Sequence, residues 1–120
     1  MGKIDEQLAF LPATELRELI RNRKVSPVEV TQMYLDRIDR LDSKLHSYLT
    51  ITSEIALKSA RNAERDVMEG KELGLLHGVP ISIKDLQMTK GVRTTSGSLA
   101  YKNRIPDADC AVVELSLIHI

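Results

Sequence analysis

The chain has 120 residues, of which 42% are hydrophobic and 28% are charged, and its 17 basic and 17 acidic side chains give no net charge. This length and balance are typical of at most one globular domain, and a neutral chain exerts no long-range attraction on nucleic acid or on an anionic membrane. No window approaches the roughly 20 apolar residues that a membrane helix needs, and the first ten residues lack the apolar core of a signal peptide, so we expect a cytoplasmic protein.

The first predicted helix covers about residues 13–23. Leu16, Leu19 and Ile20 fall on one face of this helix, which indicates that this face is buried. Pro12 suits the start of the helix, because proline is tolerated in the first turn.

The second predicted helix has the clearer start signal. Ser26 and Glu29 have the spacing of a capping box, Pro27 falls at the first helical position, and Val25 is placed to pack against Val30 across the turn. We interpret the apolar stripe of this helix as part of the core and not as a cofactor site. The stripe consists of Val30, Met33, Tyr34, Ile38 and Leu41.

Two short segments predict strands on either side of a third helix. Residues 47–52 are β-branched and alternating, and residues 79–83 form an apolar run. The helix between them is predicted over about residues 53–69, with Gly70 placed for a left-handed cap. Its buried face is predicted to be Ala56, Ala60, Ala63 and Val67. The order of strand, helix and strand predicts an α/β fold with a parallel or mixed sheet.

Lys84 directly follows the second predicted strand. Val79, Ile81 and Ile83 share one face of that strand, whereas Ser82 and Lys84 share the other. Functional groups gather beyond the carboxyl ends of the strands in such sheets, and burial of an unpaired ammonium favours the neutral amine that can act as a base. The alternative is an exposed lysine that pairs loosely with its neighbour Asp85, and the local pattern leaves both interpretations open.

The other reactive residue types predict neither a cofactor nor a metal. Residues 89–98, TKGVRTTSGS, form a turn-rich loop that lacks the spacing of a phosphate-binding or dinucleotide-binding loop. The three histidines, His46, His77 and His119, are far apart, so we interpret them as surface or hydrogen-bonded loop residues. The single cysteine, Cys110, lies in a small and apolar run, where we expect a packed thiol and not a nucleophile.

The sequence GLLHGVPISIKDLQMTKGVRTTSGS, followed by IPDADCAVVE, resembles the N-terminal part of the amidase signature family. The upstream sequence ELIRNRKVSPVEVTQMYLDRID is similar to the helical beginning of the same family, so the resemblance runs from about Leu8 to Glu114. It implies that Lys84 is the terminal base of a Ser–cis-Ser–Lys triad that hydrolyses the carbon–nitrogen bonds of amides. It also implies that the chain holds the N-terminal helices and the first strands of a larger mixed sheet.

The resemblance further implies that both serines of the triad lie outside this chain. In the family they belong to a downstream segment, rich in glycine and serine, that also supplies the donors for the oxyanion, and these 120 residues contain no such segment. We therefore expect residues 1–114 to be a truncated amidase signature domain, inactive alone, from a parent that acts on a small-molecule amide. Residues 115–120, LSLIHI, resemble translated sequencing-adapter sequence, and the alternative is an apolar helix end or strand.

Three alternatives remain open at this stage. One subunit of glutamyl-tRNA amidotransferase shares these motifs and releases ammonia from glutamine for its partner, but YKNRIPDADC favours a stand-alone amidase. A complete Ser–Lys hydrolase built on Ser82 and Lys84 is disfavoured, because their Cα atoms would lie about 6.5–7 Å apart on a strand. A non-catalytic interaction module is the third. The expected protein partners are a second copy of the same protein, in a homodimer, or the other subunits of an amidotransferase. Direct binding to nucleic acid is not expected.

Overall fold

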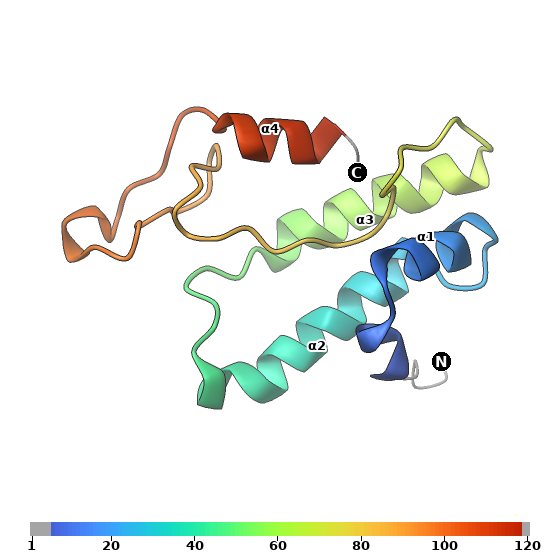
Figure 1. Ribbon diagram of the computed structural model, residues 1–120, viewed down its shortest axis with the longest axis horizontal. Helices are drawn as coiled ribbons and strands as arrows, with labels where there is room; N and C mark the ends of the chain where they lie inside the picture. The colour runs from blue at the N-terminus through green and yellow to red at the C-terminus, as the bar shows by residue number, and fades with distance from the viewer. Residues whose placement is uncertain (1–5, 119–120) are drawn as a thin grey trace.

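The computed structural model describes residues 6–118, which form helices joined by long irregular segments (Figure 1). Helices α2 and α3 pack against each other and run in opposite directions, with α1 beside the start of α2. In chain order the elements are the 3-10 helix η1 (Glu6–Phe10), α1 (Ala13–Arg21), α2 (Pro27–Leu45), α3 (Ser53–Met68), the 3-10 helix η2 (Leu99–Tyr101) and α4 (Ala111–Ile118).

The start of α2 is fixed by its own side chains. The Ser26 hydroxyl accepts a hydrogen bond from the Glu29 main-chain N–H at 3.0 Å, and the Glu29 carboxylate accepts one from the Ser26 N–H at 2.9 Å. With Pro27 as the first helical residue, the predicted capping box is confirmed. The other predicted bounds are also close, since α1 ends at Arg21 and α3 at Met68.

The predicted buried faces of α2 and α3 are confirmed. Val30 and Met33 are buried in α2, and Ala60 and Val67 are buried in α3, with the other predicted face residues half-buried. The chain leaves α3 through Gly70, whose φ of +70° is the left-handed conformation that the sequence predicts. Local sequence signals therefore determine both helices and their ends.

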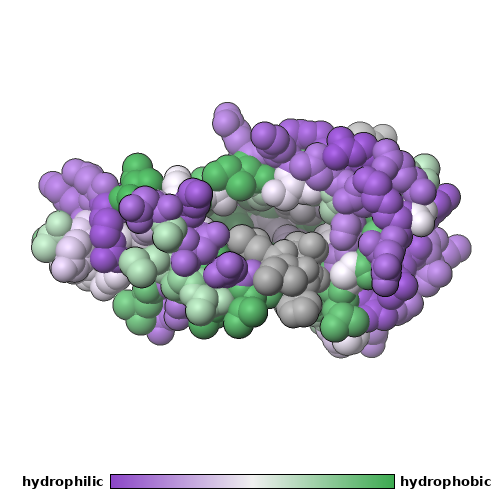
Figure 2. Space-filling view, turned by 90° about the horizontal axis from the view of Figure 1, so that it is seen from above, coloured by the Kyte–Doolittle hydropathy of each residue, from purple (hydrophilic) through white to green (hydrophobic). Residues whose placement is uncertain are grey.

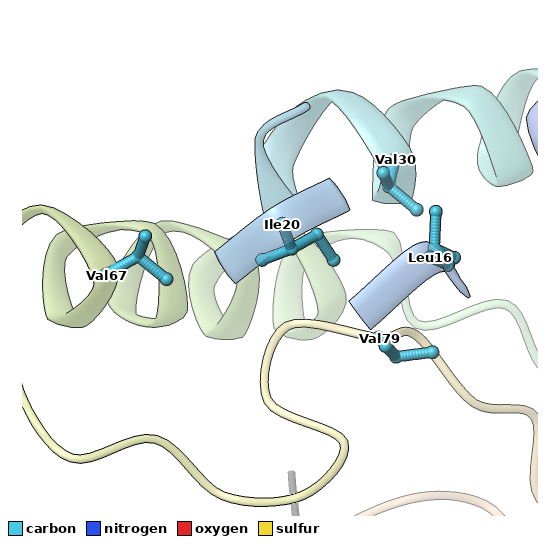
Figure 3. Close-up of a cluster of buried hydrophobic side chains, with 5 residues drawn as sticks. All are labelled: Leu16, Ile20, Val30, Val67 and Val79. Carbon is cyan, nitrogen blue, oxygen red and sulfur yellow. The ribbon is translucent and has the colours of Figure 1, made fainter. Parts of the chain in front are cut away.

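The core joins helices α1, α2 and α3 to the segment that follows α3. Leu16, Ile20, Val30, Val67 and Val79 converge from α1, α2, α3 and this segment, and each is at most 7% exposed (Figure 3). Burial of one such side chain contributes roughly 1.5–3 kcal/mol relative to exposure. This cluster thus holds the chain after α3 against the helices.

Gly78 permits the close approach of that segment to the helices. Its φ is +78°, and a Cβ atom at this position would lie 2.9 Å from Pro27 Cγ and 3.3 Å from Ile20 Cγ2. The neighbouring His77 is buried, and its Nε2–H donates a hydrogen bond to the Ala63 carbonyl oxygen at 3.0 Å. The interpretation of His77 as a hydrogen-bonded loop residue is confirmed.

The two other histidines mark different parts of the chain. His46 is the C-cap of α2, with a left-handed φ of +51° and its main-chain N–H bonded to the Asp42 carbonyl oxygen at 2.8 Å. His119 lies outside the described residues.

Residues 115–120, which resemble adapter-derived sequence, begin inside helix α4. The helix continues without interruption through Ser116 as far as Ile118, and residues 119–120 lie outside the described range.

The two predicted strands do not form, so this part of the α/β prediction is wrong. Across residues 6–118 every regular element is a helix, and residues 47–52 and 79–83 are irregular. A strand needs a neighbour that exchanges main-chain hydrogen bonds with it, and no described segment pairs with either one in a ladder. Instead the Val79 N–H donates to the Leu76 carbonyl oxygen at 3.0 Å, which closes a tight turn.

Large apolar side chains remain on the surface around the second of these segments. Ile81 is 44% exposed and Ile83 is 37% exposed, whereas Val79, which shares their face of the predicted strand, is 6% exposed. No second layer covers the two isoleucines within residues 6–118. Figure 2 shows apolar side chains interspersed with polar ones over the part of the surface that is seen from above. The Cα radius of gyration, 15.1 Å, exceeds the value of about 14 Å expected for a compact domain of this length.

We expect the isolated chain to self-associate through these exposed apolar residues, because contiguous apolar surface drives association in water. Sedimentation velocity over a range of concentrations should show a rising mean mass. The double variant Ile81→Thr/Ile83→Thr should shift the distribution toward monomer. Ile55→Thr, which alters an exposed isoleucine on α3, is the matched control. A monodisperse wild-type monomer with a cooperative melt would contradict the expectation.

Candidate functional site

Residues 84–110 form an arm in which two segments run antiparallel without making a regular ladder. The Gly91 N–H donates to the Pro106 carbonyl oxygen at 2.9 Å, and the Thr94 N–H donates to the Arg104 carbonyl oxygen at 3.0 Å. In Figure 1 the arm is the gold and orange part of the chain that extends away from the helices on the left. The arm contains Lys84 at its first position, so its internal hydrogen bonds decide where that residue lies.

Asp85 is the centre of hydrogen bonding at the base of the arm. Its carboxylate accepts hydrogen bonds from the Thr95 N–H at 2.8 Å, from the Thr95 hydroxyl, and from the Gly97 N–H at 3.2 Å. Its main-chain carbonyl oxygen accepts a hydrogen bond from the Ser96 N–H at 3.1 Å. Donors from three consecutive residues thus converge on one residue, and we call this arrangement the Asp85 clamp.

The backbone of residues 95–98 is folded so that these donors face Asp85. Ser96 has a φ of +53° and Gly97 a φ of +69°, and the Ser98 N–H donates to the Thr95 carbonyl oxygen at 3.0 Å. Positive φ at both central positions is the pattern of a type I′ turn, which glycine adopts at little cost. Arg104 supports the turn, since its Nη2 donates to the Ser96 hydroxyl at 2.6 Å.

The clamp changes the acidity of Asp85. The hydrogen bond from the Thr95 side chain, followed by that from the Thr95 main chain, lowers the pKa of Asp85 below its ordinary value, although burial acts in the opposite direction. A carboxyl group whose pKa is lowered by folding contributes stability above its unfolded pKa and loses it as the pH falls through the folded pKa. The clamp should therefore be closed at neutral pH and open in acid.

Removal of the Thr95 hydroxyl should raise the pKa of Asp85 toward its ordinary value of about 3.9, because the largest stabilising contact of the carboxylate is lost. The titration midpoint of the Asp85 carboxyl carbon, followed by NMR, should be higher in Thr95→Val than in the parent. The measurement uses the Ile81→Thr/Ile83→Thr background, which is expected to favour the monomer. Ser98→Ala removes a nearby hydroxyl outside the clamp and should leave the midpoint unchanged. Equal midpoints in Thr95→Val and its parent would contradict the assignment.

Lys84 lies on the surface, immediately before the clamp. Its carbonyl oxygen accepts a hydrogen bond from the Gln87 N–H at 2.9 Å, which closes a turn over residues 84–87. The side chain is exposed, and within residues 6–118 its ammonium has no hydrogen-bond or ion-pair partner. The loose pairing with Asp85 that the sequence leaves open is absent from the structure, because the Asp85 carboxylate is turned toward Thr95 and Gly97.

The serines near Lys84 do not complete a catalytic set with it in the described part of the chain. Ser82 is exposed and irregular rather than held on a strand. The Ser96 hydroxyl accepts the hydrogen bond from Arg104, and the Ser98 hydroxyl accepts one from the Ala100 N–H at 3.3 Å. These contacts place no nucleophile beside the Lys84 amine.

Cys110 ties the far end of the arm back to the turn that holds Lys84. Its thiol donates to the Gln87 side-chain oxygen at 3.1 Å, and its main-chain N–H donates to the Met88 carbonyl oxygen at 2.9 Å. The thiol is half-buried, as expected for a packed cysteine. The turn is therefore held by the Asp85 clamp on one side and by Cys110 on the other.

Arg93 fastens the arm to the segment between α2 and α3. Its Nη2 donates to the Leu49 carbonyl oxygen at 2.6 Å, its Nε to the Thr50 hydroxyl at 3.2 Å, and its Nη1 to the Lys102 carbonyl oxygen at 3.1 Å. One guanidinium thus joins both sides of the arm to the segment between α2 and α3. This contact takes the place of the predicted strand pairing around residues 47–52.

Other kinds of site are not found in the described residues. No group of three or more histidine, cysteine, aspartate or glutamate side chains within residues 6–118 is arranged to hold a metal ion. None of the helices in the same range is long and apolar enough to cross a membrane.

Sequence reasoning missed the clamp and the role of Arg93. The sequence suggests Asp85 only as a partner for Lys84, and Thr95 and Gly97 only as loop residues. One sequence signal could have predicted the clamp. The carboxylate of Asp85 is followed about ten residues later by hydroxyl residues and a glycine, a combination that can present successive main-chain N–H groups to an acceptor. Nothing in the sequence signals the Arg93 contacts, which depend on the tertiary path of residues 47–52.

Comparison with known proteins places these features in a family context. The sequence model of the Amidase family matches residues 29–116. A glutamyl-tRNA(Gln) amidotransferase subunit of Carboxydothermus hydrogenoformans is 41% identical over 108 residues, which cover 90% of this chain and 22% of the relative. "Putative amidase AmiD" of Mycobacterium bovis is 41% identical over 112 residues, which cover 92% of this chain and 24% of the relative.

A solved structure shows the same arrangement of the chain. The crystal structure of a bacterial aryl acylamidase of the amidase signature enzymes matches with a TM-score of 0.81 and 29% identity, covering 88% of this chain and 23% of that one. The chain therefore spans about a quarter or less of the length of the proteins it matches. Both Lys84 and the Asp85 clamp lie inside the matched range.

Proposed function

The chain belongs to the amidase family, and on that premise we propose that it supplies the lysine base of an enzyme that hydrolyses amide carbon–nitrogen bonds. In this proposal Lys84 is the terminal base of a Ser–cis-Ser–Lys triad. Both serines belong to a part of the full-length protein outside these 120 residues. The observation that best supports the role of Lys84 is its place in the Lys-Asp motif within the residues that match the Amidase family. In the structure it begins a turn that is held on both sides.

The chemistry of the triad explains why a lysine is required. A serine hydroxyl is a weak nucleophile until a base removes its proton, and a neutral lysine amine can remove it through a bridging hydroxyl. The serine oxygen then forms a bond to the amide carbon, and the proton returns through the relay to the leaving nitrogen as the carbon–nitrogen bond breaks. Water releases the acyl group in a second step. In this scheme the contribution of the present chain is to hold the base in place.

A second candidate within the family is the glutaminase component of a tRNA-dependent amidotransferase. It is favoured by the relative from Carboxydothermus hydrogenoformans, which is as similar to this chain as the AmiD protein is. The hydrolytic step would be the same, with glutamine as the amide and ammonia delivered to a partner protein. The residues described here serve either substrate, so substrate choice depends on the remaining part of the protein.

The experiment that tests the proposal is a substrate panel with the full-length protein. Aryl amides, alkyl amides and glutamine are incubated with it, and the released amine or ammonia is measured. Hydrolysis of aryl or alkyl amides supports a stand-alone amidase, whereas glutamine hydrolysis that rises with co-purified partner proteins supports the amidotransferase. A full-length protein that binds a partner specifically but hydrolyses none of these compounds would favour the non-catalytic interaction module instead.

A further inference from the structure

We propose that the Asp85 clamp positions Lys84, so that Asp85 is a positioning residue for the base and Thr95 is its principal support. The role of Lys84 in this inference rests on the proposed function. The clamp itself is a feature of the described chain, formed by contacts on both the side chain and the main chain of Asp85.

The clamp fixes the backbone on the C-terminal side of Lys84. The Lys84 carbonyl oxygen is held by the Gln87 N–H at 2.9 Å, and the Asp85 carbonyl oxygen is held by the Ser96 N–H at 3.1 Å. The peptide planes before and after Asp85 are therefore both held by hydrogen bonds. The plane before Asp85 adjoins the Lys84 Cα, and the plane after Asp85 limits how far that first plane can rotate, so together they restrict the direction in which the Lys84 side chain leaves the backbone.

Both carboxylate oxygens of Asp85 are used in the clamp. One oxygen accepts the Thr95 N–H, and the other accepts the Thr95 hydroxyl and the Gly97 N–H. Hydrogen bonds to an ionised acceptor are stronger than those between neutral groups, so the carboxylate is an effective anchor for this turn. An Asp85 engaged in this way orients the backbone of Lys84 and is not the ion-pair partner of its ammonium.

The donor side of the clamp is itself braced. Arg104 donates from Nε to the Thr94 carbonyl oxygen at 3.0 Å and from Nη2 to the Ser96 hydroxyl at 2.6 Å. Its guanidinium carbon lies 4.5 Å from the centre of the Tyr101 ring, within the range of a cation–π contact. The turn that presents the donors to Asp85 is thus held from its other side.

Positioning matters because lysine is a long and flexible base. Its side chain carries about 2 kcal/mol of rotamer entropy, and a base must come within about 2.6–3.2 Å of the oxygen whose proton it takes. A displacement of about 1 Å in a catalytic group can reduce the rate about 10²-fold. A fixed backbone at Lys84 removes one source of such displacement.

The test compares variants of the full-length enzyme in one amide-hydrolysis assay. Asp85→Asn keeps the size of the side chain but replaces one acceptor oxygen with a donor, which faces the N–H and hydroxyl donors of the clamp. We expect its kcat to fall about 10²-fold with KM changed by less than about 3-fold, and with the thermal melt preserved. Thr95→Val should act in the same direction, whereas Thr95→Ser keeps the hydroxyl and should remain active.

Two further variants make the result specific. Asp107→Asn removes an exposed carboxylate of the same arm that has no hydrogen-bond partner in the described structure, and it should leave kcat unchanged. Lys84→Ala tests the proposed function in the same assay. A fully active Lys84→Ala overturns the role of the base and with it this inference.

An inactive Lys84→Ala together with normal kcat in Asp85→Asn overturns the positioning role alone. A rise in KM without loss of kcat, or an equal loss in Asp107→Asn, also overturns it. If Asp85→Asn fails to fold, the comparison of Thr95→Val with Thr95→Ser decides, and equal kcat values in these two variants would contradict the proposal.

Discussion

Lys84→Ala in the full-length protein is expected to lower kcat by about 10²–10⁴-fold or more, because in the proposed triad the nucleophilic serine loses the base that accepts its proton. The fold should be retained. The Lys84 side chain is exposed and contacts no partner among the described residues, so its removal leaves no cavity and no unpaired buried group.

The measurement is steady-state hydrolysis of the best amide substrate, together with a thermal melt of each variant. Lys90→Ala removes an exposed lysine of the same arm and should retain full activity. Lys84→Arg keeps a positive charge but cannot act as a neutral base, so it should be as impaired as Lys84→Ala. Near-normal hydrolysis by Lys84→Ala would restore the interpretation of Lys84 as a surface residue.

The 120-residue chain on its own is expected to hydrolyse no amide. The residue of the proposed triad that it contains is the base, and a base without a serine relay has no nucleophile to activate. Ser96 and Ser98 do not substitute, because their hydroxyls accept hydrogen bonds from Arg104 and Ala100 and do not contact Lys84. The loss should therefore be complete, in contrast to the residual activity of a single-residue variant.

This expectation is checked with the purified chain, the same panel of aryl amides, alkyl amides and glutamine, and the Lys84→Ala form of the chain as a control. Turnover that disappears in Lys84→Ala would show a complete site within these residues and would contradict the proposal that the serines lie elsewhere. Turnover that is equal in the two forms would come from a contaminating hydrolase.

Helices α1, α2 and α3 could be predicted because their signals are local, whereas α4 was not predicted. The capping pair Ser26 and Glu29 lies within one helical turn, and each side chain satisfies a main-chain N–H of the other residue. The buried faces of α2 and α3 follow from the helical period alone. Gly70 likewise ends α3 through its own conformation.

The strands could not be predicted correctly because a strand depends on residues that its own sequence does not specify. Alternation at residues 79–83 suits a half-buried strand, but without a paired neighbour Ile81 and Ile83 stay exposed and only Val79 enters the core. The same holds at residues 47–52, where the Arg93 guanidinium and not a strand occupies the main-chain acceptor of Leu49.

The candidate site could be predicted in part. Lys84 is proposed as a site residue through its resemblance to a family motif, since periodicity alone does not distinguish it from a surface lysine. The Asp85 clamp is missed because its donors come from Thr95 to Gly97 and reach the carboxylate only after the chain reverses through two left-handed residues. Which earlier residue the reversed chain contacts is a property of the tertiary structure. The preferences of single residues for turns do not identify it.

The attachment of the arm has a consequence for local unfolding. The apolar core cluster ends at Val79 and takes no residue from the arm, whereas Arg93 joins the arm to the helical part through hydrogen bonds at Leu49 and Thr50. The arm can therefore open while that cluster stays intact, at a lower free energy than global unfolding. Lys84 is the first residue of the arm, so under the proposed function the closed arm is the state in which the base is held in place.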